Sequence, residues 1–229
     1  IEERRQIIID ELGHDTLFSS LNPKTYNNMI ENAISTYEIP FGIAPGLMIN
    51  HKNYVIPMAT EEPSVIAAQA NAAKIITRNG GIKAKVIGQD MIGQIAFYDP
   101  KPDLHSLIEQ EYDVLFEIAN KAKPSIVQRG GGLKQLTWEY KEAKHLGRFF
   151  IVYASIDTQE AMGANIVNTI MEALKKHLEP LFQQTATMAI LSNLADQSLV
   201  EVSCTIDPKT LKNPEKIAEK MQEASAFAQ

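Results

Sequence analysis

Glu62 is the carboxylate whose neighbours point most clearly to chemistry. It stands directly before Pro63 and Ser64, at the expected start of an alanine-rich helix that residues 79–81 (Asn-Gly-Gly) should end. A carboxylate at such a position can donate and accept protons in a reaction. It can equally do no more than complement the positive end of the helix dipole, and the residues alone leave both interpretations open.

A second segment has the features of an anion site. Residues 160–165 (Glu160, Ala161, Met162, Gly163, Ala164 and Asn165) join a predicted strand to the start of a helix predicted over 165–184. Unpaired backbone N–H groups and the dipole at a helix start favour phosphate, and Gly163 lets a ligand approach the backbone. Asn165 is a residue type that caps helices, so an ordinary capped helix start explains the segment equally well.

Basic side chains gather in a predicted hairpin turn, where Lys141, Lys144 and Arg148 are joined by His145. Such a cluster is usually a solvated loop tip, although it could also hold a phosphate. The three glycines at 130–132 are not followed by the helix that a phosphate loop requires, and they predict a structural turn.

Composition excludes several classes of protein. The net charge of −6 argues against nucleic-acid binding, and the five histidines show no metal-ligand spacing. The apolar runs are shorter than the roughly 20 residues that a membrane span needs. The single cysteine, Cys204, excludes an intramolecular disulfide, and the alternating run around it predicts a buried strand residue. We therefore expect a cytoplasmic protein without a metal, nucleic-acid or membrane partner.

Hydrophobic periodicity predicts the elements that must position these residues. The helices are expected at 1–12 (with Ile7, Ile8 and Leu12 on one side), from Pro23 to Ala33, and at 63–79, 101–122, 165–184 and 214–226. The strands are expected as a short pair within 47–58 that turns at 50–53, and at 84–98, 133–140, 149–156, 188–191 and 199–206. The alanines at 67, 68, 70, 72 and 73 predict that the helix over 63–79 is wrapped by its neighbours.

This order predicts an α+β fold. Residues 83–206 read β-α-β-β-α-β, which is typical of a ferredoxin-like domain with both helices on one face of an antiparallel sheet. Residues 1–82 and 207–229 would then form part of a mainly helical large domain into which this unit is inserted.

Several separated motifs resemble one family, the bacterial, class II hydroxymethylglutaryl-CoA reductases. They occur in order, at the family's spacing, in residues 29–34, 39–44, 55–68, 130–132, 160–169 and 191–196. The resemblance spans nearly the whole chain.

The resemblance implies reduction of hydroxymethylglutaryl-CoA to mevalonate and CoA with two equivalents of NAD(P)H. It implies that Glu62 is the catalytic glutamate, which supplies protons to the carbonyl oxygen, and that Ser64 and Asn193 lie beside the substrate. It also implies that residues 160–165 carry the dinucleotide. The cofactor domain of this family is a ferredoxin-like insertion, and its members are at least dimers.

Two departures from the family pattern affect the cofactor site. Glu160 replaces the usual aspartate, which we expect to be tolerated. Ala143 stands among Lys141, Lys144 and Arg148 where NADH-preferring members carry an aspartate, and loss of a carboxylate beside added cations predicts a preference for NADPH over NADH.

The resemblance also implies residues beyond position 229. The family's catalytic lysine, a further aspartate and a histidine on a C-terminal flap have no counterpart here, so we expect the chain to be a piece of a longer protein that is inactive alone. Two alternatives remain: a non-enzymatic, ligand-binding regulatory protein with a ferredoxin-like domain, or a fragment that binds dinucleotide without reducing anything.

Overall fold

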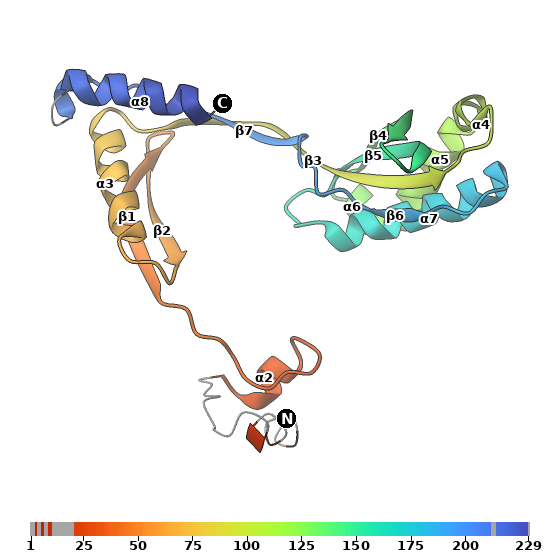
Figure 1. Ribbon diagram of the computed structural model, residues 1–229, viewed down its shortest axis with the longest axis horizontal. Helices are drawn as coiled ribbons and strands as arrows, with labels where there is room; N and C mark the ends of the chain where they lie inside the picture. The colour runs from red at the N-terminus through yellow and green to blue at the C-terminus, as the bar shows by residue number, and fades with distance from the viewer. Residues whose placement is uncertain (1–2, 4–5, 7–8, 11–20, 212–213, 229) are drawn as a thin grey trace. The chain divides into compact units, whose positions relative to one another are not determined.

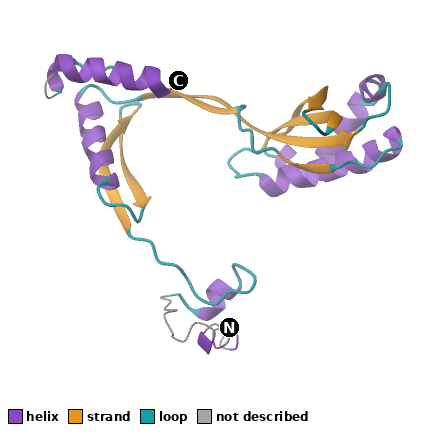
Figure 2. Cartoon of the chain, viewed as in Figure 1, coloured by secondary structure: helices purple, strands orange, loops and turns teal. Residues whose placement is uncertain are grey.

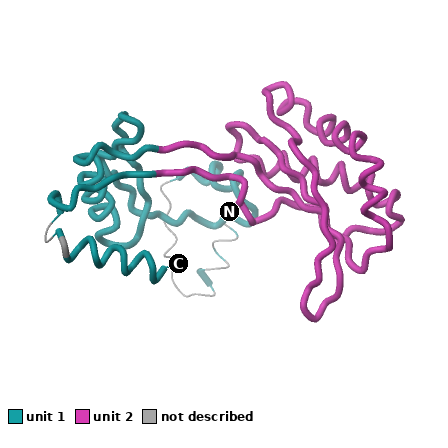
Figure 3. Tube along the Cα trace, turned by 90° about the horizontal axis from the view of Figure 1, so that it is seen from above, with its two compact units in different colours: residues 1–83, 203–229 teal, residues 84–202 magenta. Residues whose placement is uncertain are grey.

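The chain divides into two compact units. The computed structural model describes residues 3, 6, 9–10, 21–211 and 214–228, so the predicted stripe of Ile7, Ile8 and Leu12 lies outside the described residues. Unit 1 comprises residues 1–83 and 203–229, and unit 2 comprises residues 84–202 (Figure 3). Helices and antiparallel sheets make up both units, so the mixed architecture expected from the sequence is confirmed (Figure 2).

Unit 1 contains a β-hairpin of β1 (Phe41–Ile49) and β2 (Lys52–Ala59). Asn50 and His51 between the strands both have positive φ, 48° and 64°, which is the conformation of the tight turn that joins antiparallel strands. The turn was predicted correctly. The first strand, however, begins six residues before the predicted start at Leu47, within a stretch that we expected to be irregular.

Helix α3 (Val65–Arg78) packs against β1 (Figure 1). It ends as predicted, because the N–H of Gly81 donates to the carbonyl of Ile76 at 3.0 Å. It begins two residues later than predicted: Ser64 is its N-cap, with φ 71°, and Pro63 lies in the preceding turn.

The prediction that α3 is wrapped by its neighbours is wrong for the described chain. Ala73 is buried, at 1 % exposed, whereas Ala67, Ala68 and Ala72 are exposed. The described residues do not cover these three alanines, and the high helix propensity of alanine accounts for their presence in α3.

Unit 1 also contains α2 (Pro23–Asn27), the 3-10 helix η1 (Pro208–Thr210) and α8 (Pro214–Ala228). Asn22 caps α2 as predicted, by accepting from the N–H of Lys24 at 2.9 Å. The helix stops after five residues instead of reaching Ala33, and Asn32, with φ 53°, has a left-handed conformation that a right-handed helix does not contain.

Unit 2 is built on an antiparallel sheet. Its strands are β3 (Lys83–Tyr98), β4 (Gly132–Ala143), β5 (Gly147–Asp157) and β6 (Met188–Leu191), in the spatial order β4-β5-β3-β6. The fifth strand, β7 (Ser198–Ser203), pairs with β3 outside this path. All β7 side chains are exposed and Cys204, which follows the strand, is exposed too, so the expectation of a buried cysteine is wrong.

Four helices belong to unit 2: α4 (Leu104–Gln110), α5 (Tyr112–Ala122), α6 (Pro124–Val127) and α7 (Ala164–Phe182). The single helix expected over 101–122 is broken at Glu111, which stands between α4 and α5. The Glu111 carboxylate lies 2.8 Å from Nε2 of His177 in α7, a tertiary contact that hydrophobic periodicity does not reveal.

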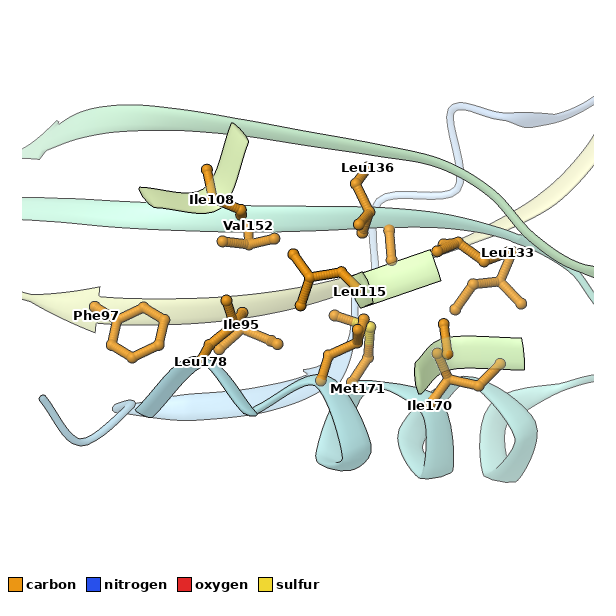
Figure 4. Close-up of a cluster of buried hydrophobic side chains, with 14 of the residues drawn as sticks. Ile95, Phe97, Ile108, Leu115, Leu133, Leu136, Val152, Ile170, Met171 and Leu178 are labelled. Carbon is orange, nitrogen blue, oxygen red and sulfur yellow. The ribbon is translucent and has the colours of Figure 1, made fainter. Parts of the chain in front are cut away.

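The core of unit 2 lies between the helices and one face of the sheet (Figure 4). Ile95 and Phe97 of β3 and Val152 of β5 meet Leu115 of α5 and Met171 of α7, and all five are fully buried. Strand side chains alternate between the two faces, so the residues between these core positions form an opposite, helix-free face. That face mixes polar residues, such as Thr137 and Glu139, with apolar ones, such as Phe149 and Ile151.

Candidate functional site

The segment 160–165 leads into the longest described helix of unit 2. Gly163 is the N-cap of the 19-residue α7, with φ 91°, and Ala164 and Asn165 are its first two residues. Asn165 is therefore not the cap, contrary to the expectation. The N–H groups of the first helical turn lack partners within the helix, so this end of α7 can bind an anion. Met162 (76 % exposed) and Asn165 are open to solvent here.

A side chain underneath explains why position 163 is glycine. A Cβ on Gly163 would lie 2.5 Å from Cγ2 of Thr158, and its positive φ already disfavours other residues. The Thr158 hydroxyl donates to the carbonyl of Ala161 at 3.0 Å, so the loop folds tightly over this side chain.

The glycine turn at 130–132 lies next to the same loop. Gly132 pairs with Asp157 across β4 and β5, and a Cβ on Gly131 would overlap the carbonyl oxygen of Asp157. Lys134 places its Nζ 3.4 Å from Oδ2 of Asp157. The turn is structural, as predicted, and it brings one cation to the base of the loop.

Asn193 lies at the same edge of the sheet as this loop. Strands β5 and β6 each pair antiparallel with β3, so they run parallel to each other and their C-terminal ends lie at one edge. Segment 160–165 follows β5, and Asn193, which is exposed, follows β6. Unit 2 therefore brings two of the expected functional segments to one edge.

The tip of the basic hairpin, with Lys144 and Arg148, lies away from this edge. Arg148 stands nine residues before Asp157 in an extended strand, which separates them by about 30 Å at roughly 3.3 Å per residue. Lys141 pairs with Phe149, and Lys144 lies in the turn beyond it.

The role of this hairpin in cofactor binding stays a prediction, and a pyrophosphate held by segment 160–165 does not favour it. A single ribose joins the 2′-phosphate of NADP(H) to the pyrophosphate, and it cannot reach across the length of β5. Arg148 has local partners instead: its guanidinium lies 4.0 Å from the Tyr140 ring centroid, and its Nε is 3.8 Å from Glu142.

Glu62 and Ser64 lie in unit 1, in the turn that precedes α3. Both are exposed, and the N–H of Glu62 donates to Oγ1 of Thr60 at 3.1 Å. This hydrogen bond uses the backbone of Glu62, so the Glu62 carboxylate takes no part in holding the turn. The pair thus stands at a helix start, as the sequence indicated.

A cavity of about 400 Å³ opens on the face of the unit 2 sheet opposite the helices. Residues of β3, β4, β5 and the segment after β6 line it: Ile92, Gln135, Thr137, Glu139, Lys141, Tyr153, Ser155, Ser192, Leu194, Asp196 and Gln197. The Tyr153 hydroxyl donates to Glu139 at 2.9 Å. Burial, with this hydrogen bond to a carboxylate, raises the pKa of Tyr153 to about 12, so the phenol is neutral at physiological pH.

The described residues contain neither a candidate metal cluster nor a candidate membrane-spanning helix. No cluster of three or more histidine, cysteine or carboxylate side chains suited to a metal occurs among them. The described helices include none that is both long and apolar enough to span a membrane.

Sequence reasoning missed three residues at the loop: Lys134, Asp157 and Thr158. One signal for them was available. The apolar alternation of β5 ends in the polar pair Asp157 and Thr158 directly before the glycine-containing loop, where a buried strand would otherwise continue.

Comparison with known proteins identifies the class of protein that this arrangement represents. A profile of the hydroxymethylglutaryl-coenzyme A reductase family matches residues 1–229. The chain is similar to the class II 3-hydroxy-3-methylglutaryl-CoA reductase of Streptococcus pneumoniae bound to NADPH, with a TM-score of 0.85 and 40% identity over 100% of this chain. The chain belongs to the hydroxymethylglutaryl-CoA reductase family.

Curated relatives agree with this assignment. The chain is 37% identical over 222 residues to the 3-hydroxy-3-methylglutaryl-coenzyme A reductase of Archaeoglobus fulgidus, and 32% identical over 217 residues to a probable enzyme of the same name from Borreliella burgdorferi. These alignments cover 96% and 92% of this chain but 50% and 48% of the relatives. The chain spans about half the length of these relatives and 65% of the Streptococcus pneumoniae chain.

Proposed function

We propose that this chain supplies the dinucleotide-binding unit and the catalytic glutamate of an oxidoreductase that reduces hydroxymethylglutaryl-CoA to mevalonate and CoA with two NAD(P)H. The observation that carries the proposal is the loop at 160–165, in which a glycine with positive φ opens a 19-residue helix. The proposed reaction is that of the family to which the chain belongs. NAD(P)H, when bound, supplies the hydride.

The proposed roles follow the position of each residue. Residues 160–165 hold the pyrophosphate at the start of α7, because the free N–H groups and the helix dipole both favour negative charge there. Asn193, at the same edge, lies beside the reacting carbonyl. Glu62 supplies protons to the carbonyl oxygen, and Ser64 contacts the substrate; both are exposed at a helix start and free to meet a ligand.

Unit 2 corresponds to the small, ferredoxin-like, dinucleotide-binding domain in this proposal. The strand order β4-β5-β3-β6, with a helical connection after β3 and another after β5, supports this assignment. Residues 1–82 and 207–229 belong to the large, substrate-binding domain, and the active enzyme is at least a homodimer.

We propose that the cofactor is NADPH rather than NADH, on two observations that do not involve the basic hairpin. The similar structure from Streptococcus pneumoniae is bound to NADPH. Lys134 lies at the base of the loop. Its contact with Asp157 is long, at 3.4 Å, and its side chain is 44% exposed, so its ammonium group can pair with a 2′-phosphate.

Two measurements on the protein that contains this chain test the proposal. Titration with NADPH, followed by its fluorescence, should show saturable binding, and hydroxymethylglutaryl-CoA should stimulate NADPH oxidation. Glu62→Gln should abolish the oxidation and leave NADPH binding intact. Binding of dinucleotide without turnover would favour the non-reducing alternative, and binding of neither ligand would favour a regulatory protein of another kind.

A further inference from the structure

Two polar residues are buried within the described part of the chain, and both lie under the loop at 160–165. Asp157 is 7% exposed and Thr158 is 2% exposed. Burying a polar side chain is unfavourable unless its hydrogen bonds are made. Both residues make theirs with the loop or the turn next to it.

Asp157 fixes Gln159, the residue that leads into the loop. Its Oδ1 accepts from the backbone N–H of Gln159 at 2.8 Å, and its Oδ2 accepts from Nε2 of the same residue at 2.8 Å. Gln159 has φ 54°, a left-handed conformation that is uncommon for a residue with a side chain. The two bonds from one carboxylate hold Gln159 in that conformation, and Lys134 balances the carboxylate charge from the glycine-turn side.

Thr158 fixes the rest of the loop. Its hydroxyl donates to the carbonyl of Ala161, and its backbone carbonyl accepts from the N–H of Ala161 at 3.2 Å. Its methyl and hydroxyl groups leave no room for a side chain at position 163. The loop therefore wraps around Thr158 and delivers Gly163 to the start of α7.

We infer that Asp157 and Thr158 are positioning residues for the dinucleotide: they hold residues 159–163 in the binding conformation before the ligand arrives. A loop that is already ordered loses less conformational entropy on binding, so the pair increases affinity without touching the ligand. This inference rests on the proposed function, in which the loop holds the pyrophosphate that NADPH and NADH share.

The test compares dissociation constants for NADPH and NADH across matched variants of the chain. Thr158→Val keeps the shape and removes the hydroxyl, and it should raise both constants by the same factor, about fivefold to tenfold, from one lost hydrogen bond. Thr158→Ser keeps the hydroxyl and should bind nearly as the wild type does. Tyr153→Phe is the control, since it removes one partly buried hydroxyl donor from β5 whose hydrogen bond goes to Glu139 and not to the loop.

A second variant separates positioning from stability. Gln159→Gly suits the left-handed conformation and loses the side-chain bond to Asp157, so it should not lower the thermal midpoint but should raise both dissociation constants about threefold. This variant also decides the question if Thr158→Val does not fold.

Three results would overturn the inference. In the first, Thr158→Val and Gln159→Gly both bind dinucleotide as the wild type does. In the second, Tyr153→Phe weakens binding as much as Thr158→Val, which would mark a general effect of stability. In the third, wild-type protein binds neither NADPH nor NADH, and then the proposed function fails together with this inference.

Discussion

Gly163 connects sequence, packing and ligand chemistry at a single residue. Its φ of 91° and the side chain of Thr158 leave no room for a Cβ, while the same absence of a side chain opens the start of α7 to a ligand. The structural and functional explanations of this glycine therefore do not compete.

Gly163→Ala should test both explanations together. The added methyl must displace Thr158 and occupy a disfavoured conformation, so we expect a loss of about 1–3 kcal/mol in the free energy of unfolding. NADPH binding should weaken in parallel, measured by fluorescence titration alongside urea unfolding. An unchanged dissociation constant in the folded variant would show that the loop is not the binding site.

Lys134 makes a separate prediction about cofactor choice. Lys134→Met removes the charge at the base of the loop and keeps most of the side-chain length. It should raise the dissociation constant for NADPH about tenfold more than that for NADH, because only NADPH carries the 2′-phosphate, whereas loss of the cation beside Asp157 affects both cofactors alike. Lys144→Met, in the distant hairpin, is the control and should change neither. The opposite pattern would restore the hairpin as the phosphate site.

Tyr153 should make the stability of the protein depend on alkaline pH. Its pKa is raised to about 12 in the folded state from an ordinary value of 10.0, so its neutral form stabilises the fold. The unfolded chain releases this proton first, and the contribution is therefore lost as the pH rises from about 10 to about 12. In denaturant unfolding, wild type should lose stability relative to Tyr153→Phe over that window. A constant difference between them would contradict the assignment.

At the scale of the elements, β3 and α7 pack closely at Gly93. Of the glycines in unit 2, this is the one where an added Cβ would make the shortest contact. A Cβ on Gly93 would overlap Sδ of Met171, which is fully buried in the core. Gly93 thus lets the helix lie close to the sheet and keeps its N-terminus at the edge where the loops open.

Gly93→Ala should destabilise unit 2 by about 1–3 kcal/mol through overpacking, as measured by urea unfolding. In that background Met171→Ala should cost less than it does in the wild type, because the smaller side chain makes room for the new methyl. Additive effects of the two substitutions would mean that the two side chains do not compete for space.

The elements also show what the sequence could and could not reveal. Helix α7, the turn at Asn50 and the end of α3 were predictable, since each depends on local periodicity or on residues that suit a particular turn. The break at Glu111 was not, because it accompanies a contact with His177 in a distant helix. Burial of Cys204 was predicted wrongly, since alternation shows which residues share a face but not whether anything covers that face.

The same distinction applies to the candidate site. Segment 160–165 was identifiable from its glycine and the helix that follows. The separation of the basic hairpin from that segment was not identifiable. The basic residues stand 12 to 19 residues before the segment in the sequence, and the register of the hairpin decides whether they lie beside the loop or a full strand length from it. The register of β4 and β5 decides this in favour of separation.

At the scale of the whole molecule, unit 2 holds its own core and every residue proposed here to bind the dinucleotide. Its core draws on three strands and three helices that all belong to residues 84–202. We therefore expect residues 84–202, expressed alone, to unfold cooperatively and to bind NADPH within about threefold of the affinity of the 229-residue chain. Titration of both proteins under the same conditions measures this. Loss of binding in the isolated unit would mean that unit 1 contributes directly to the cofactor site.

The central claim is that the dinucleotide binds at the start of α7. The most direct test is to follow backbone amide resonances of the chain by NMR as NADPH is added. We expect the largest shifts at residues 161–165, smaller ones near Lys134, and none at residues 143–148 in the hairpin turn. Large shifts in the hairpin, or saturable binding that leaves residues 161–165 unchanged, would contradict this claim.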